Sequence, residues 1–181
     1  MRTALKFLIL IFLTTSLTSC EKIKSWFNVD IDTVIEGQMD LVSSNTELKS
    51  VEAYSINGSE PIDLSDNEDL ADYVDLINDI KTHSVNLYVT GVDAAGVVIH
   101  AGSEFTISTP TNPGLSWPIS EDWPIQQGTS VELTANDYSE LNKMLEGNEI
   151  VTFAATGTCN VGGVHITLTY EIDVTVEAEP L

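Results

Sequence analysis

The amino-acid sequence predicts a mostly β fold, an antiparallel two-layer β-sandwich or partly open barrel of seven or eight strands with two covering helices. Three observations support this prediction. Apolar and polar residues alternate over several long stretches, as in strands with one buried face. Turn signals containing Gly, Pro or Asn separate those stretches. The 181 residues are 43% hydrophobic, which is enough for one core, so residues 27–181 are expected to form a single β-rich domain.

The first strand is predicted over residues 27–41. Its odd positions are mostly apolar and its even positions mostly Asp, Glu, Asn or Gln, which gives one buried face, with a bend at Gly37. A weaker strand is expected over 51–56. It should end at the turn Asn57-Gly58, with a short return strand at 62–64.

A helix is predicted over residues 66–80. Ser65 stands three residues before Glu68, which is the spacing of a capping box at a helix start. Apolar residues then recur at helical intervals, at Leu70, Tyr73, Val74, Ile77 and Ile80. The acidic residues on the opposite side lack the spacing of a calcium-binding loop, so we expect a solvent-exposed face and no metal site there.

Two β-hairpins are predicted. In the first, strands 85–91 and 97–107 flank the turn Ala94-Ala95-Gly96. In the second, strands 151–159 and 164–176 flank a short Gly-containing loop. In both cases the apolar positions of the two strands would lie opposite each other if the strands paired around the turn.

The two predicted hairpins suggest an internal duplication. Residues 85–91 resemble residues 151–157, 66 positions further along (151 minus 85). A helix precedes each hairpin, the second being predicted over 135–146 after a short strand at 131–133 with Thr134 as its cap. We therefore expect two units of shared architecture, each a helix followed by a hairpin, and common ancestry of the halves is a hypothesis.

Residues 108–128 contain four prolines and are predicted to form an irregular loop. Trp117 and Trp123 on this loop are each followed by Pro-Ile. Indole faces stack on sugar rings and other flat apolar surfaces, so both are candidate ligand contacts. The alternative is that they plug the end of the core.

No catalytic or metal-binding residue is predicted, and no cofactor. Pairing Cys159 with Val164 in the second hairpin would place Cys159 on the apolar face and His165 on the polar face, so the two cannot form a nucleophile–base dyad. The three histidines lack metal-ligand spacing. Since no nucleophile elbow, phosphate loop or paired-carboxylate motif is present, we expect that the protein is not an enzyme.

The N-terminal residues carry an export signal. Arg2 and Lys6 precede the apolar run 7–13, which is too short to span a bilayer. The tetrapeptide Leu17-Thr18-Ser19-Cys20 that follows resembles the lipobox of bacterial lipoproteins. This resemblance implies a signal peptide over residues 1–20, a lipid on Cys20, and a leader over 21–26. The alternative is an ordinary cleaved signal that leaves Cys20 as a free thiol.

The charge of the chain excludes one class of function. With 28 acidic against 7 basic residues the net charge is −21, which is unsuited to nucleic-acid binding. The residue after Cys20 is Glu21 and not Asp. In this respect the sequence resembles lipoproteins that are sorted to the outer membrane. We therefore expect a lipid-anchored cell-envelope protein with a non-catalytic binding or scaffolding role and a possible protein partner. The alternatives are a glycan-binding module that uses Trp117 and Trp123, and an enzyme of unknown class.

Overall fold

The computed structural model of the chain describes residues 28–48, 53–147 and 149–180. The predicted signal peptide (1–20), the lipidation site Cys20 and the leader (21–26) lie outside the described residues. Antiparallel strands dominate the described part. The elements are the strands β1 (Val29–Glu47), β2 (Tyr54–Ile62), β3 (Ile77–Val92), β4 (Val98–Ile99), β5 (Glu104–Ser108), β6 (Leu115–Pro118), β7 (Trp123–Pro124), β8 (Ser130–Glu132), β9 (Val151–Cys159) and β10 (His165–Ala178), the helix α3 (Ser139–Leu145), and two 3-10 turns (Leu64–Asp66, Val74–Leu76).

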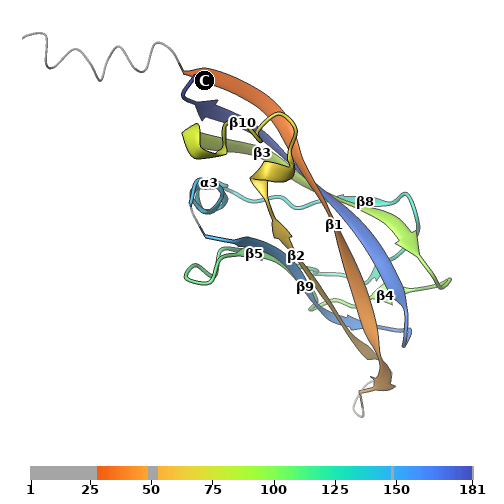
Figure 1. Cartoon of the computed structure of the whole chain (residues 1–181). Helices are drawn as coiled ribbons and strands as arrows, with labels where there is room; N and C mark the ends of the chain where they lie inside the picture. Colours follow the sequence, from red (N-terminus) through yellow and green to blue (C-terminus); the bar gives the residue numbers. More distant parts are fainter. Residues whose placement is uncertain (1–27, 49–52, 148, 181) are drawn as a thin grey trace, which may run out of the picture.

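The strands form two layers that are joined on one side only. The hydrogen-bonded order is β6-β5-β9-β2-β1-β10-β3-β8, so one layer is β8-β3-β10-β1 and the other is β2-β9-β5-β6. The layers connect where the end of β1 pairs with β2 (Figure 1), for example Ser43 with Ile56. On the other side the order ends at β6 and β8. This arrangement is an eight-stranded jelly roll that is open along one seam, which confirms the predicted sandwich or partly open barrel.

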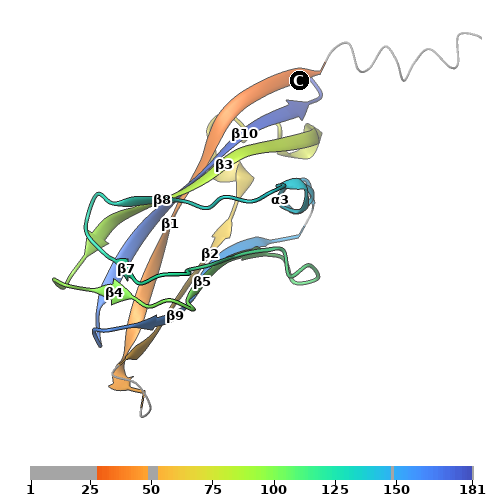
Figure 2. The same ribbon diagram turned by 180° about the vertical axis from the view of Figure 1, so that it is seen from behind.

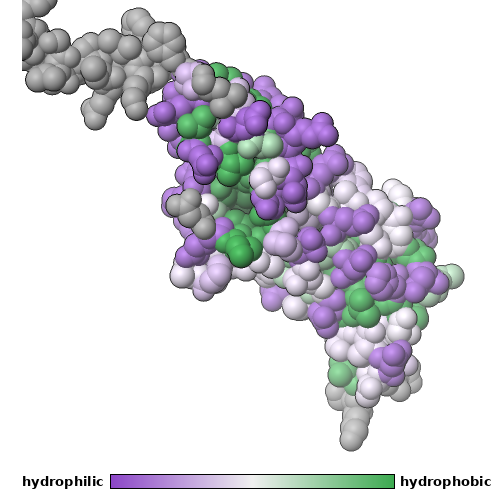
Figure 3. Space-filling view, viewed as in Figure 1, coloured by the Kyte–Doolittle hydropathy of each residue, from purple (hydrophilic) through white to green (hydrophobic). Residues whose placement is uncertain are grey.

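The longest strands are those with the most regular alternation in the sequence. β1 pairs with β10 without interruption from Val29 to Val42, and the odd residues of β1 and even residues of β10 face the core. Tyr170 of β10 lies across from Gly37 of β1, and its ring occupies the place where a side chain on Gly37 would be. The glycine therefore makes room for a buried aromatic ring, and the pairing with β10 is unbroken there. Hydrophilic residues cover most of the visible face, and apolar ones show in the opening between the layers beside α3 (Figure 3).

The helix predicted over 66–80 is wrong. Residues 64–76 form turns, and the chain enters β3 at Ile77. The pairing of β3 with β10 skips Asn78, His83 and Thr90, so each is a bulge that adds one residue to β3. A bulge in β3 spaces inward-facing residues three apart, as at Ile77 and Ile80, and this spacing imitated the helical period.

The turn predicted at Asn57-Gly58, with a return strand at 62–64, is also wrong. β2 runs straight through both residues and pairs with β9 along its whole length, Gly58 lying opposite Ala155. A side chain on Gly58 would collide with the main-chain oxygen of Asp40. The glycine is needed for a close approach of β1 and β2 and not for a turn.

Neither predicted hairpin forms. β3 pairs with β10 and β8, whereas β5 pairs with β9 and β6, so the turn at Gly96 carries the chain from one layer to the other. The turn at Gly163 between β9 and β10 does the same. Both glycines have positive φ, 71° and 69°. The alternation of apolar and polar residues correctly identified the side chains that face the core. The two strands of each predicted hairpin lie in different layers, so their apolar side chains face each other across the core and are not neighbours in one layer.

The strand order nevertheless places the two halves in equivalent positions. β3 lies between β8 and β10 in one layer, and β9 lies between β2 and β5 in the other. The strands β2, β3 and β5 thus correspond to β8, β9 and β10, in the same chain order. The predicted shared architecture holds for these strands, whereas the helix-plus-hairpin description of the repeat does not.

The only α-helix in the described part of the chain is α3, which is shorter than the predicted 135–146. Asp137 accepts the backbone N–H of Ser139 where the helix begins, so Thr134 is not its cap. Leu141, Met144 and Leu145 are buried. The polar side of α3 protects the uncovered edge of β3. The side chains of Asn142 in α3 and of Glu146, which directly follows the helix, accept hydrogen bonds from the backbone N–H groups of Thr82 and Ile80 at 3.0 Å and 2.9 Å.

Candidate functional site

Trp117 and Trp123, predicted as ligand contacts, line the same groove at the open side of the jelly roll. Trp117 lies on β6 and Trp123 on β7, so the predicted irregular loop 108–128 contains two short strands. The groove has a volume of about 520 Å³ and runs between residues 116–123 on one side and residues 131–134 on the other. Seen from behind, β7 and β8 lie on the same side of the molecule, in different layers (Figure 2). We call this opening the seam groove. Its volume is in the range of small-ligand and peptide sites.

Trp117 forms the floor of the seam groove. Its side chain is only 8% exposed, and the indole Nε1–H donates a hydrogen bond to the backbone oxygen of Thr134 at 3.1 Å. The ring therefore bridges the gap between β6 and the segment after β8. Its burial and this hydrogen bond favour the plug interpretation for Trp117, because a bonded indole at this depth offers little surface to a ligand.

Trp123 is the more accessible of the two rings. It is half-buried and meets Phe105 edge to face, with ring centroids 6.0 Å apart and an interplanar angle of 76°. Phe105 in turn stacks on Phe153, and Phe153 contacts Tyr170 at 5.0 Å. This row of four aromatic rings connects the groove with the centre of the core.

Burial, together with the nearby negative charges, raises the pKa of Tyr170 to about 12.

The rim of the seam groove is acidic. Glu121, Asp122 and Glu132 line it, and no Lys or Arg is among the described residues that do so. Asp122 accepts hydrogen bonds from the Ala101 backbone N–H at 3.0 Å and from His100 Nδ1 at 3.3 Å. These bonds hold the pKa of Asp122 below its ordinary value. The groove thus presents carboxylate acceptors around an apolar floor.

Backbone groups complete the site. Val89 N–H donates to the oxygen of Thr129 at 2.9 Å, and Leu133 N–H donates to that of Val85 at 2.8 Å. Because bonded residues alternate in an antiparallel ladder, the peptide groups of Ser130 and Glu132 point away from β3. Both residues are exposed. β8 therefore borders the seam groove with an unpaired edge.

β6 presents a similar edge on the opposite side. Ile119 N–H donates to the oxygen of Ser103 at 2.7 Å, which fixes the same alternation along the pairing with β5. The peptide groups of Ser116 and Pro118 consequently turn away from β5, and both residues are exposed. Pro118 has no N–H, so this edge is the poorer in donors.

Other chemistry is not assembled in the described part of the chain. His100 and Asp122 lie together, but no hydroxyl or thiol there is hydrogen-bonded to the other ring nitrogen of His100. Cys159 is fully buried, with its thiol directed at the oxygen of Val161, while His165 is exposed. The two point apart, although the hairpin pairing from which this was predicted does not exist. No group of three or more His, Cys, Asp or Glu among the described residues could hold a metal ion.

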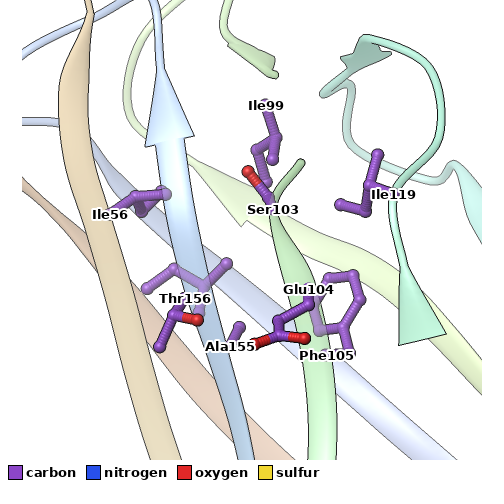
Figure 4. Close-up of a pocket in the computed structure, with 9 residues that line it drawn as sticks. Ile56, Ile99, Ser103, Glu104, Phe105, Ile119, Ala155 and Thr156 are labelled. Atoms are coloured by element: carbon purple, nitrogen blue, oxygen red, sulfur yellow. The ribbon is translucent and has the colours of Figure 1, made fainter. Parts of the chain in front are cut away.

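A second hollow is too small for a ligand. It lies inside the sandwich among Ile56, Ile99, Ser103, Phe105 and Ile119, with a volume of about 10 Å³ (Figure 4). A space of that size holds at most one water molecule. Nor does the described part of the chain contain a helix of the length and apolarity needed to cross a membrane.

The sequence identified the two tryptophans of the seam groove but not its other components. In the sequence, Glu121, Asp122 and Glu132 are part of the general acidity of the chain, which does not assign them to a site. Glu121 and Asp122 adjoin Trp123 in sequence, a signal that could have been used. The unpaired edges of β6 and β8 could not have been found, because they follow from long-range strand order.

Comparisons with known proteins give no family for this chain. No family model matches it, and neither does any curated protein. Among solved structures, "Desmodium yellow mottle tymovirus" matches at 10% identity over 83% of this chain and 90% of that chain, with a TM-score of 0.36. A virus-like particle of the giant freshwater prawn Macrobrachium rosenbergii nodavirus matches at 9% identity over 84% and 96%, also at 0.36. Likeness at this level carries no argument about function.

Proposed function

We propose that the protein is a lipid-anchored cell-envelope protein with a non-catalytic binding role, and that the seam groove is its binding site. The observation that carries the proposal is the convergence of an accessible aromatic ring, three carboxylates and two unpaired strand edges at one opening. The anchor is the lipid on Cys20 implied by the lipobox resemblance, and Glu21 favours the outer membrane.

The same groove argues for binding and not for catalysis. Asp122, with its lowered pKa, stays ionised at neutral pH and accepts hydrogen bonds, but it is a poor general acid. The hydroxyl of Ser116 donates to Glu104 at 2.7 Å, and both residues are exposed, so water competes for that carboxylate. The seam groove therefore offers recognition groups without an activated nucleophile among its described residues.

Glycan binding is a second candidate, favoured by Trp123. Its half-buried ring lies beside Glu121 and Asp122, whose oxygens could accept hydrogen bonds from sugar hydroxyls while the indole stacks on a sugar ring. A ligand of this kind would quench or shift the emission of Trp123 and leave that of the bonded Trp117 nearly unchanged.

In-cell photocrosslinking tests the proposed site. A photoreactive residue is placed at Ser120 in the groove or, as a control, at Val42, which is 48% exposed on β1. We expect a discrete adduct from Ser120 that Trp123→Ala removes, and none from Val42. Equal crosslinking at both positions, or none at either, would contradict the groove as the binding site. The anchor is tested separately by the mass of the mature N-terminus, where an unmodified Cys20 would refute it.

A further inference from the structure

The two layers of the jelly roll are joined by β1 and β2 but end in free strands on the opposite side. The edge of β8 there exposes the N–H and C=O groups of Ser130 and Glu132. An unpaired row of peptide groups is a template for one more strand. Native proteins often protect such edges by keeping them short and charged, and β8, with 3 residues including Glu132, is short and charged.

Beside the free edge of β8 lies an apolar floor, which a strand edge that is only protected against further pairing would not need. Phe105, Trp117 and Leu133 line the seam groove, and the half-buried Trp123 stands next to them. In strand addition the main-chain bonds give affinity, while alternate side chains enter pockets beside the edge. The seam groove supplies both parts: a row of free peptide groups and an apolar recess alongside it.

The charge of the groove indicates what the added segment carries. Its rim has Glu121, Asp122 and Glu132, and no Lys or Arg lines it in the described part of the chain. A strand alternates its side chains between two faces. An extended segment with apolar residues at every second position would place these on the aromatic floor, and Lys or Arg at the intervening positions would face the carboxylates.

Resting on the proposed binding role of the groove, we propose that its occupant is an extended basic segment of a partner protein, which adds to the free edge of β8 as a further strand and closes the seam. The lengths of β6 and β8, 4 and 3 residues, limit the paired part to a few residues. A glycan stacked on Trp123 would leave the peptide groups of Ser130 and Glu132 unused, so these groups favour the protein segment.

The test uses the full lipidated chain in a neutral detergent and a short end-blocked peptide of alternating lysine and valine as the probe, with binding followed by calorimetry. Two further peptides carry N-methyl groups on the valine amides or on the lysine amides, so that each loses the donors on one of its edges. We expect the unmodified peptide to bind and one methylated peptide to bind about ten-fold more weakly than the other.

Protein variants test the same edge from the other side. Ser130→Pro removes the free N–H of residue 130 and should weaken binding about ten-fold, whereas Ser130→Ala keeps the N–H and should bind like the wild type. Thermal unfolding of both variants checks that they fold. If Ser130→Pro does not fold, the methylated peptides decide the question alone.

The outcomes separate this inference from the proposed function. Equal binding of all three peptides would overturn strand addition in favour of charge attraction alone, and the groove would remain the site if Trp123→Ala still abolished binding. Quenching of Trp123 by a polysaccharide, with no peptide bound, would overturn it in favour of a glycan. Failure of every probe, together with no crosslink from Ser120, would remove the proposed function as well.

Discussion

Replacing Trp117 by Ala tests which of the two tryptophans holds the fold together. The indole is 8% exposed and bridges β6 to the segment after β8 through its hydrogen bond to Thr134. Loss of such a ring costs about 3 to 5 kcal/mol, because the cavity it leaves closes only partly. Trp123→Ala removes a half-buried ring and its contact with Phe105, which is worth about 0.5 to 1.5 kcal/mol beyond area burial. We therefore expect Trp117→Ala to lower the free energy of unfolding by clearly more than Trp123→Ala.

Urea unfolding followed by circular dichroism measures both values, and Trp117→Phe serves as an intermediate control. Phe keeps much of the apolar ring but loses the hydrogen bond to the oxygen of the exposed Thr134, at a net cost of about 0.5 to 1.5 kcal/mol. A Trp117→Ala variant as stable as Trp123→Ala would refute the plug interpretation. Trp117 would then be a surface residue, free to contact a ligand.

Three further predictions concern the core and α3. Gly37→Ala should destabilise the fold by about 1 to 3 kcal/mol in urea unfolding, because the new methyl group overlaps the Tyr170 ring, and an unchanged midpoint would contradict the packing. The pKa of Tyr170 is raised to about 12, so the unfolded chain loses the phenolic proton at a lower pH than the folded protein does. The free energy of unfolding should therefore fall by about 1.4 kcal/mol per pH unit between pH 10 and 12. Tyr170→Phe should flatten this slope, and identical slopes for the variant and the wild type would contradict the burial of the Tyr170 hydroxyl. Asn142→Ala should speed amide exchange at Thr82 by removing the acceptor of its N–H, and an unchanged rate would show that α3 does not protect β3.

The sequence predicted what depends on local alternation. The period of two in β1 and β10 identified strands, buried faces and the fold class, since both strands pair over most of their length without interruption. It failed where the strand departs from that period. The bulge at Asn78 gives Ile77 and Ile80 the spacing of residues on one helix face, and Asn57-Gly58 has the sequence of a turn although β2 runs through it.

The candidate site likewise has some features that the sequence predicted and others that depend on the fold. Trp117 and Trp123 were visible as large aromatic residues in a proline-rich stretch, and the structure brings both to one groove. The two rings differ in burial, because Trp117 is buried and bonded to Thr134 whereas Trp123 is half-buried. Strand pairing is a long-range property that alternation does not encode, so the free edges beside them were out of reach of sequence reasoning.

The most direct test of the account is amide hydrogen exchange at Ser130 and Glu132 with and without a partner. Their N–H groups point away from β3 and should exchange fast in the free protein. When a crosslinked partner or the lysine–valine peptide occupies the seam groove, both amides should become protected, while amides at the joined side, such as that of Asn57 between β1 and β9, should not change. Binding that leaves Ser130 and Glu132 exchanging at the free rate would contradict the assignment of the seam groove edge as the binding site.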